Sequence, residues 1–179
     1  MTTALTGRMA EHLVCAELAR RKLIATTFTH NIPKFDVLVA DDQCRTIPIQ
    51  VKATSDGSWR SSADTWMNIE FDEAKKIQVI MGEKTCATPD LIWVCVVARP
   101  AEPAQQADQF FILTEREIQQ ICISNYQEVL AKYSGQRPRN WRSLDFWWNT
   151  SDLSAYENKW ETIKGRLKGD MPQLPVTNP

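Results

Sequence analysis

A chain of 179 residues is long enough for one domain with a well-buried core, and a second full domain would be cramped. Hydrophobic residues make up 43% and charged residues 24%, close to the average of globular proteins, which excludes disorder over most of the length. The formal net charge of −1 gives no overall attraction to polyanions, so any binding of nucleic acid has to rely on local basic patches.

No apolar run in the sequence approaches the roughly 18 to 20 residues that a membrane-spanning helix requires. The N-terminus lacks the basic and apolar regions of a signal peptide. The odd number of cysteines and their wide spacing favour reduced thiols over a disulfide framework or a Cys-x-x-Cys zinc site. These cysteines are Cys15, Cys44, Cys86, Cys95 and Cys122. We therefore expect a cytoplasmic protein that does not contact a membrane.

The first predicted element is a helix from Gly7 to Lys22, with Thr6 as its cap. Its apolar residues recur at helical spacing. Glu11 precedes Val14 and Leu18 by three and seven positions, which places its carboxylate on the side of the helix that faces inward. An acid at the edge of the apolar stripe is the equally acceptable ordinary interpretation.

The stretch from Phe35 to Thr54 predicts two strands around a polar turn. Side chains alternate along a strand, so Gln50 and Lys52 point away from the apolar face of the second strand. If the hairpin folds about Gln43, the numbers of paired residues sum to 86, which sets Asp36 opposite Gln50. An acid, an amide and an amine then share one small patch, because opposed Cβ atoms lie only ~5 Å apart. Taken singly, the acid and the lysine are also what an exposed strand carries.

The remaining elements of the first two thirds follow from β propensity, turn residues and charge order. We expect strands at 25–29, 66–71, 91–98 and 109–113, a loop at 55–63 and a short helix at 72–82. The segment 91–98 is apolar on both faces, which predicts a central strand covered on both sides. The helix at 72–82 is predicted because its acids come early and its lysines later, as the helix dipole favours.

The last third is predicted to hold two helices, at 115–134 with Thr114 as cap and at 152–167, joined by a loop. The loop is rich in arginine and tryptophan, which can contact phosphates and stack on bases or sugars. The candidate nucleic-acid-binding residues are therefore Arg137, Arg139, Trp141 and Arg142. The alternative is that the tryptophans pack on the core and the arginines are solvated.

The order of these elements and motifs resembles the PD-(D/E)XK nuclease superfamily, which includes many restriction endonucleases. The resemblance covers residues 7 to about 98. Its motifs are Gly-x-x-x-Glu at 7–11, Phe-Asp-Val at 35–37 and Gln-Val-Lys-Ala-Thr at 50–54. Phe35 stands where the family name implies proline. Gln50 replaces the usual acid, as in the Mrr-like branch, whose motif is Gln-x-Lys.

The resemblance implies an α/β fold with a restriction-endonuclease-like mixed β-sheet core flanked by helices, and a C-terminal helical extension. We expect one nuclease-like domain over 1–169, with a core at about 5–134, a Trp/Arg-rich loop and helix at 135–169, and a loose tail at 170–179. The implied function is a metal-dependent endonuclease, a hydrolase that cleaves phosphodiester bonds in DNA. Many nucleases of this fold are dimers, so a homodimer is also possible.

The resemblance also assigns roles to the residues of the hairpin and the first helix. Asp36, the side-chain oxygen of Gln50 and the backbone carbonyl of Val51 are implied to hold Mg²⁺ or Mn²⁺. Glu11 is implied as an additional ligand. Lys52 is implied to orient or help deprotonate the attacking water and to stabilise charge on the phosphate.

Two further interpretations stay open from the sequence. One is a nuclease-fold module that binds nucleic acid or a protein partner but does not cleave, which Gln50 and the pI of ≈ 6.1 support. The other treats the Trp-rich C-terminal part as a protein interface. Burial of Trp141, Trp147 and Trp148 within the monomer would remove much of the reason for that second interpretation.

Overall fold

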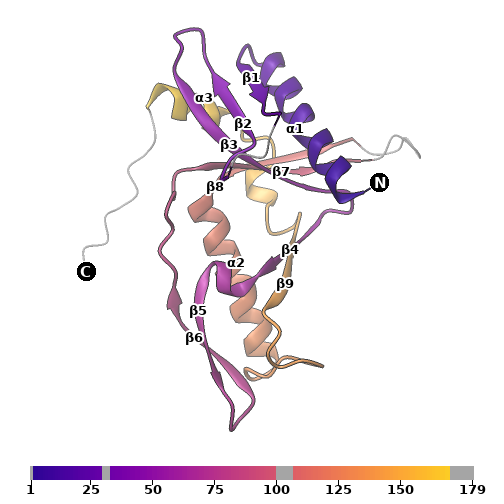
Figure 1. The fold of residues 1–179 in the computed structure, drawn as a ribbon, viewed down its shortest axis with the longest axis vertical. Coiled ribbons are helices and arrows are strands. Elements are labelled where there is room, and N and C mark those ends of the chain that lie inside the picture. Colours follow the sequence, from indigo (N-terminus) through magenta and orange to yellow (C-terminus); the bar gives the residue numbers. More distant parts are fainter. Residues whose placement is uncertain (1, 30–32, 100–106, 170–179) are drawn as a thin grey trace.

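The computed structural model describes residues 2–29, 33–99 and 107–169, and its upper half is built on a mixed five-stranded sheet (Figure 1). Its strands, in spatial order, are β1 (Ile24–Thr27), β2 (Val37–Ala40), β3 (Thr46–Thr54), β7 (Ile92–Val97) and β8 (Gln109–Thr114). Strands β3 and β7 are parallel, and the other neighbouring pairs are antiparallel. The predicted α/β fold class, with a mixed sheet and flanking helices, is confirmed.

One face of this sheet is covered by α1 (Thr3–Arg20) and α3 (Glu161–Lys168). Helix α1 begins earlier than predicted, because Thr2 is the cap and its hydroxyl accepts the N–H of Leu5 at 3.4 Å. Thr6 is buried inside the helix and donates its own hydroxyl to the carbonyl of Thr2 at 3.1 Å. The prediction of Thr6 as cap was wrong because both threonines suit that position and only the tertiary packing selects between them.

The hairpin of β2 and β3 has the predicted register. Val37 pairs with Ile49 and Leu38 with Pro48, so the numbers of paired residues sum to 86. Asp36 lies directly before β2, and its N–H donates to the carbonyl of Ile49 at 2.8 Å. The alternation of buried and partly exposed residues along β2 turns its valines toward α1. Register therefore fixes which residues stand beside Asp36.

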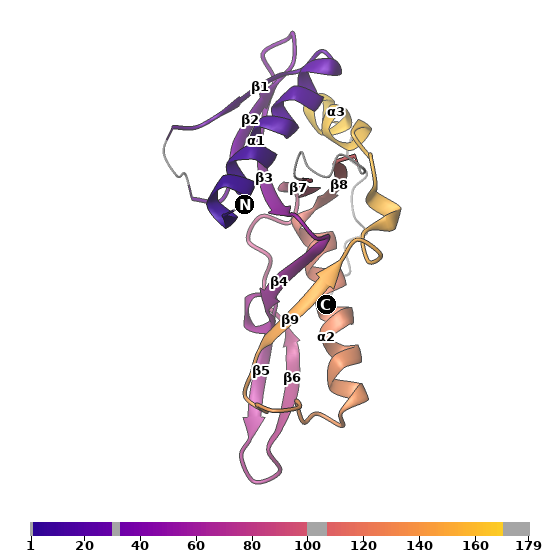
Figure 2. The same ribbon diagram turned by 90° about the vertical axis from the view of Figure 1, so that its right-hand side faces the viewer.

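The lower half of the molecule consists of two antiparallel ribbons beside α2 (Glu115–Lys132) (Figure 2). The ribbons are formed by β4 (Ser58–Ser62) with β9 (Asp145–Asn149), and by β5 (Met67–Asp72) with β6 (Ile77–Glu83). Two 3-10 turns, η1 (Ala63–Thr65) and η2 (Ser154–Tyr156), complete the fold. A second apolar cluster, rich in tryptophan, joins the ribbons, α2 and the other face of β7 and β8.

Four of the predicted elements agree with the structure. Strand β7 is buried at every position, as the apolar segment 91–98 predicted. Strands β5 and β8 match the predictions at 66–71 and 109–113, and α2 carries the predicted cap. The hydroxyl of Thr114 accepts the N–H of Glu117 at 3.2 Å, and the Glu117 carboxylate accepts the N–H of Thr114 at 2.7 Å. Within the described ranges, no helix is long and apolar enough to cross a membrane.

Segment 55–63, predicted as a loop, contains strand β4. The strand was not predicted because the segment is polar and Trp59 is its one large apolar side chain. Trp59 stacks on Trp148 of β9, with ring centroids 4.8 Å apart and planes 14° apart. A strand whose stability comes from a partner so distant in sequence leaves little local signal.

Segment 72–82, predicted as a helix, is a hairpin turn followed by β6. The acid-to-lysine order that favoured a helix is used inside the turn instead. The Asp72 carboxylate accepts the N–H of Lys75 at 3.0 Å, and Lys76 adopts a left-handed φ of 56°. The same side-chain contacts that stabilise a first helical turn also close a hairpin turn.

The predicted helix at 152–167 is shorter than expected, since only α3 is α-helical. Before it, Glu157 bridges to Phe111 of β8, and the N–H of Asn158 donates to the carbonyl of Phe110 at 2.9 Å. Asn158 has a φ of 55°, which interrupts a helix. The predicted tail at 170–179 lies outside the described residues.

Candidate functional site

The candidate site is centred on the Asp36 carboxylate, which the hairpin holds against β3. Its Oδ2 accepts the backbone N–H of Val51 at 2.8 Å and also accepts the side-chain amide of Gln50. A backbone donor and a neighbouring amide thus fix the position of this oxygen. Both contacts follow from the register, because Asp36 lies opposite Gln50 and one step from Val51.

The Gln50 amide lies between two oxygens of the site. Its Nε2 donates to Asp36 and is 3.3 Å from the carbonyl oxygen of Val51. One N–H₂ group shared by two oxygens means that these oxygens converge on a common point. Rotation of the amide about its terminal bond exchanges the nitrogen for the amide oxygen.

These atoms form an oxygen-only donor set, which is the set that Mg²⁺ and Mn²⁺ prefer. Among the described residues, no group of three or more His, Cys, Asp or Glu side chains could hold a metal ion. A cation here would therefore depend on the Gln50 amide and the Val51 carbonyl in addition to carboxylates. The convergence of these oxygens fits a small hard cation.

Glu11 approaches the site from α1, with its side chain only 14% exposed. Burial raises the pKa of this carboxyl, and the charge of Asp36 raises it further. Arg8 opposes the shift, since its guanidinium lies 2.7 Å from Glu11 Oε2, and His12 opposes it too. The acid that the sequence placed on the inward side of the helix is therefore within the electrostatic range of Asp36.

Lys52 extends from the same face of β3 as Gln50, two residues along. Its ammonium lies 5.3 Å from the centroid of the Trp93 ring on the neighbouring strand β7. Within the described part of the chain, Lys52 forms no ion pair. The aromatic ring supports the charged group while leaving its N–H donors for a ligand.

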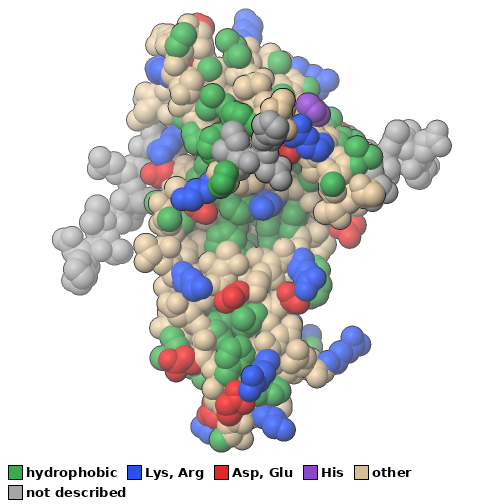
Figure 3. Space-filling model, viewed as in Figure 1, with side chains coloured by type: hydrophobic (Ala, Val, Ile, Leu, Met, Phe, Trp, Pro, Cys, Tyr) green, Lys and Arg blue, Asp and Glu red, His purple; other side chains and the backbone are tan. Residues whose placement is uncertain are grey.

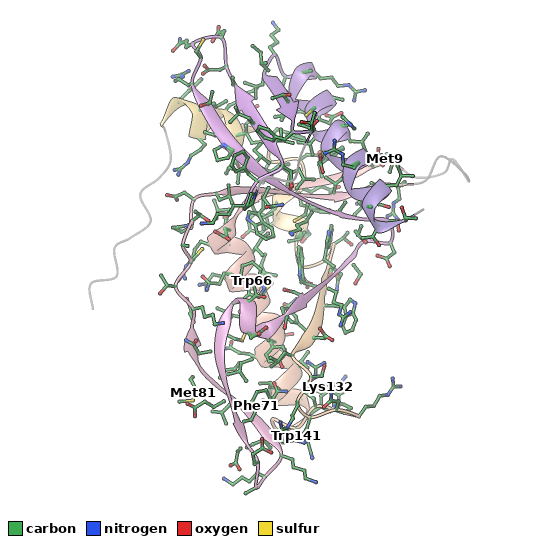
Figure 4. All side chains as sticks on the ribbon, in the orientation of Figure 1. Met9, Trp66, Phe71, Met81, Lys132 and Trp141 are labelled. Atoms are coloured by element: carbon green, nitrogen blue, oxygen red, sulfur yellow. The ribbon has the colours of Figure 1, made fainter. Side chains whose placement is uncertain are left out.

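The arginines predicted to bind nucleic acid lie far from this site. Figure 4 labels Met9 of α1 near the hairpin and Trp141 near the opposite end of the molecule. Arg137 and Arg139 line an open hollow together with Trp141, whereas Arg142 forms an ion pair with Glu73. The structure thus brings three of the four residues together, in a place separate from the candidate site.

Two residues that line this hollow, Lys76 and Tyr133, were missed in the sequence. Lys76 was missed because its segment was predicted as a helix. The β-branched residues Ile77, Val79 and Ile80 are the signal that could have found the strand. Figure 3 shows lysine and arginine side chains from one end of the molecule to the other on this face, with acids among them.

The three tryptophans of the C-terminal part differ in burial. Trp148 is buried, Trp141 is partly buried and Trp147 is 56% exposed. The condition that would have weakened the protein-interface interpretation is therefore not met. Trp147, and to a lesser degree the partly buried Trp141, keep that interpretation open.

Comparisons with known proteins find similarity only among solved structures. The sequence matches no protein-family model and no curated protein. Among solved structures, the chain is similar to a bacterial homing endonuclease, I-Ssp6803I, with a TM-score of 0.48 and 13% sequence identity. That similarity covers 96% of this chain and 100% of the other.

Proposed function

We propose that this chain is a metal-dependent endonuclease that hydrolyses phosphodiester bonds in DNA. The observation that carries the proposal is the cluster in which the Gln50 amide lies between the Asp36 carboxylate and the Val51 carbonyl oxygen. Lys52, which forms no ion pair among the described residues, extends from the same face of β3 as Gln50. Oxygens that suit a cation next to a group that suits a phosphate are what phosphodiester hydrolysis needs. The resemblance of the sequence motifs to PD-(D/E)XK nucleases supports the same activity.

Each residue of the site has a proposed role. Asp36, the Gln50 amide oxygen and the Val51 carbonyl would hold Mg²⁺ or Mn²⁺, with Glu11 as an additional ligand. When bound, such a cation lowers the pKa of water and neutralises charge on the phosphate. Lys52 donates hydrogen bonds that orient the attacking water and offset the charge that develops on the phosphate oxygens.

One observation favours a second candidate function, a module that binds nucleic acid or a protein without cleaving. The Gln50 amide already satisfies the Asp36 carboxylate and approaches the Val51 carbonyl. The cluster is thus hydrogen-bonded without any cation. A neutral amide also binds Mg²⁺ less strongly than the carboxylate that is usual at this position.

Nicking of supercoiled DNA in the presence of Mn²⁺ tests the proposal. Asp36→Asn keeps an oxygen that can accept the Val51 N–H, so the fold is retained while the charge is lost. We expect Asp36→Asn and Lys52→Ala to lower the rate more than about 100-fold, because even residues behind a metal ligand contribute ~10–100-fold. Asp42→Asn, in the exposed hairpin turn, is the matched control and keeps the wild-type rate.

Calorimetric titration with Mn²⁺ separates the two candidate functions. Heat of binding in the wild type that is lost in Asp36→Asn supports the nuclease. A wild type that binds no Mn²⁺ near neutral pH supports the non-cleaving module. Wild-type cleavage rates in either active-site variant would show that the site has been assigned to the wrong residues.

A further inference from the structure

An open hollow of about 610 Å³ lies at the end of the molecule opposite the β2–β3 hairpin. It is formed where the turn of the β5–β6 hairpin meets the loop after α2. Three cations line it, Lys76, Arg137 and Arg139, together with the aromatic rings of Tyr133 and Trp141. Cationic and aromatic side chains in one concave surface suit a ligand that has both an anionic and a planar part.

The cations of the hollow are left without acidic partners. Among the described residues, none of the three forms an ion pair, whereas the neighbouring Lys75 and Arg142 are paired with acids. Arg137 donates from Nη2 to the carbonyl of Asp145 at 2.7 Å, and its buried Nη1 has no partner in the described protein. Arg137 is thus held inward against Asp145 and the Tyr126 ring, and the exposed Lys76 and Arg139 carry the positive charge that is available to an anion.

The two aromatic rings are held at the surface in distinct ways. Trp141 packs edge-to-face on Phe71, with ring centroids 5.8 Å apart, and the Arg142 guanidinium carbon lies 5.1 Å from its centroid. Tyr133 is 40% exposed, and the ammonium of Lys132 lies 5.5 Å from its ring. Both rings thus combine apolar area with nearby positive charge, as platforms for nucleic-acid bases do.

The hollow is ordered by a buried polar network before any ligand arrives. Gln78 of β6, 3% exposed, donates from Nε2 to the carbonyls of Trp141 and Ser143, and its backbone N–H donates to Gly135 at 2.9 Å. Gly135 has a φ of 83°, and a Cβ there would lie 3.2 Å from the Cβ of Ile77. The hairpin and the loop therefore form one surface, which lowers the entropy cost of binding.

We propose that this hollow binds one unpaired nucleotide, with its phosphate on Lys76 and Arg139 and its base stacked on the aromatic pair. A base inside a duplex has both faces covered by its neighbours, so only an unpaired base can offer a face to a ring. Identification of the ligand as nucleic acid rests on the proposed function. Because the hollow is separate from the site at Asp36, the preferred substrate carries a single-stranded segment at a distance from the bond that is cut.

Binding of a fluorescent single-stranded oligonucleotide in EDTA, followed by anisotropy, tests the inference without any cleavage. Lys76 and Arg139 both have a left-handed φ, of 56° and 67°, which asparagine tolerates. Lys76→Asn and Arg139→Asn should each weaken binding about tenfold and reduce its salt dependence. Lys22→Asn is the matched control, because Lys22 is exposed with a φ of 63° in the turn between α1 and β1.

Stacking is tested at Trp141. Trp141→Leu should weaken binding about tenfold, since stacking on one ring contributes roughly 1–3 kcal/mol, while Trp141→Phe restores most of it. The inference would be overturned if the variants bound the single strand as tightly as wild type does. It would also be overturned if the wild-type protein bound duplex DNA more tightly than single strands, or if polyglutamate of equal total charge displaced the oligonucleotide.

The same measurements separate this inference from the proposed function. Lys52→Ala should abolish cleavage, and Arg139→Asn should weaken single-strand binding in EDTA. If the wild-type protein does not cleave DNA, but Arg139→Asn binds the single strand more weakly than wild type does, the proposed nuclease activity is refuted and the proposed binding at the hollow is supported. If the wild-type protein cleaves DNA, and the variants of the hollow bind the single strand as tightly as wild type does, the nuclease activity is supported and the proposed binding at the hollow is refuted.

Discussion

The two halves of the molecule carry polar clusters of different composition. At the sheet end acids and bases are mixed, since Glu11 is paired with Arg8 and Asp36 is bonded to the amide of Gln50. At the ribbon end, Lys76 and Arg139 stand beside aromatic rings without acidic partners among the described residues. A polyanion can therefore be attracted locally at the ribbon end, although the formal net charge of the chain is −1.

The two clusters are also built by different means. The sheet end uses strand alternation over an apolar core, so its side chains are placed by register. The ribbon end uses buried hydrogen bonds, in which Gln78 links β6 to Trp141 and accepts the hydroxyl of Tyr126 at 2.5 Å. A polar network is more sensitive to the loss of one member than an apolar core, because every remaining partner is left unsatisfied.

The largest expected effect on stability is at Gln78. Gln78→Leu leaves the Trp141 and Ser143 carbonyls without this donor and the Tyr126 hydroxyl without its closest acceptor. We expect the free energy of unfolding to fall by about 2–4 kcal/mol, measured by denaturant titration. Single-strand binding should fall with it, while Mn²⁺ binding at the other end is kept.

Gln127→Leu is the control for this variant, since Gln127 is exposed on α2. Its effect should stay within about 0.5 kcal/mol. If the two leucine variants unfold at the same denaturant concentration, the network does not order the ribbon end, and the contrast between the two ends is lost.

A smaller effect is expected from a change at Gln50 that increases the negative charge of the sheet end. Gln50→Glu adds a carboxylate to the oxygen set, so we expect Mn²⁺ affinity to rise about tenfold, measured by calorimetry. Without metal, the hydrogen bond to Asp36 becomes a repulsion between two carboxylates. The variant should therefore melt below wild type at pH 7 and recover as the pH falls or as Mn²⁺ is added.

The control is Gln43→Glu, which makes the same charge change in the exposed hairpin turn. It should alter neither Mn²⁺ affinity nor melting. Equal Mn²⁺ affinity in Gln50→Glu and wild type would mean that the amide does not face the cation position.

The sheet end could be predicted from the sequence because its signals are local. A short turn fixes the register of β2 and β3, and the register alone sets Asp36 opposite Gln50. Helical periodicity placed Glu11 toward the same region. What the sequence could not supply is the position of the Gln50 amide between two oxygens, since that is a property of side-chain rotation and not of spacing.

The ribbon end could not be predicted because its strands depend on distant partners. Arg60 of β4 pairs with Asp145 of β9, 85 residues away. The burial of Gln78 depends on a carbonyl 65 residues further along and a hydroxyl 48 residues further along. A glutamine is ordinarily exposed, so no local pattern marks this one as the residue that orders the hollow.

The smallest expected effect compares two glutamates of α1 that are equally covered. The side chains of Glu11 and Glu17 are 14% and 15% exposed, and each is paired with arginine. Burial and the charge of Asp36 raise the pKa of Glu11, whereas for Glu17 burial is outweighed by Arg21 and Arg20, which lower the pKa. The two carboxyls therefore affect stability with opposite signs.

Ionisation of Glu11 opposes folding, so its contribution to stability is full at acidic pH and is lost as the pH rises through its raised pKa. Glu17 contributes above its unfolded-state pKa, and that contribution is lost as the pH falls through its lowered pKa. At pH 7, Glu11→Gln should be slightly more stable than wild type and Glu17→Gln slightly less stable. Each change in the free energy of unfolding should be less than about 1 kcal/mol. Both differences should shrink toward pH 3, where the carboxyls are protonated, in thermal melts across that range. Shifts of the same sign at pH 7 would mean that burial and the charge of Asp36 together do not outweigh the effect of Arg8 on Glu11.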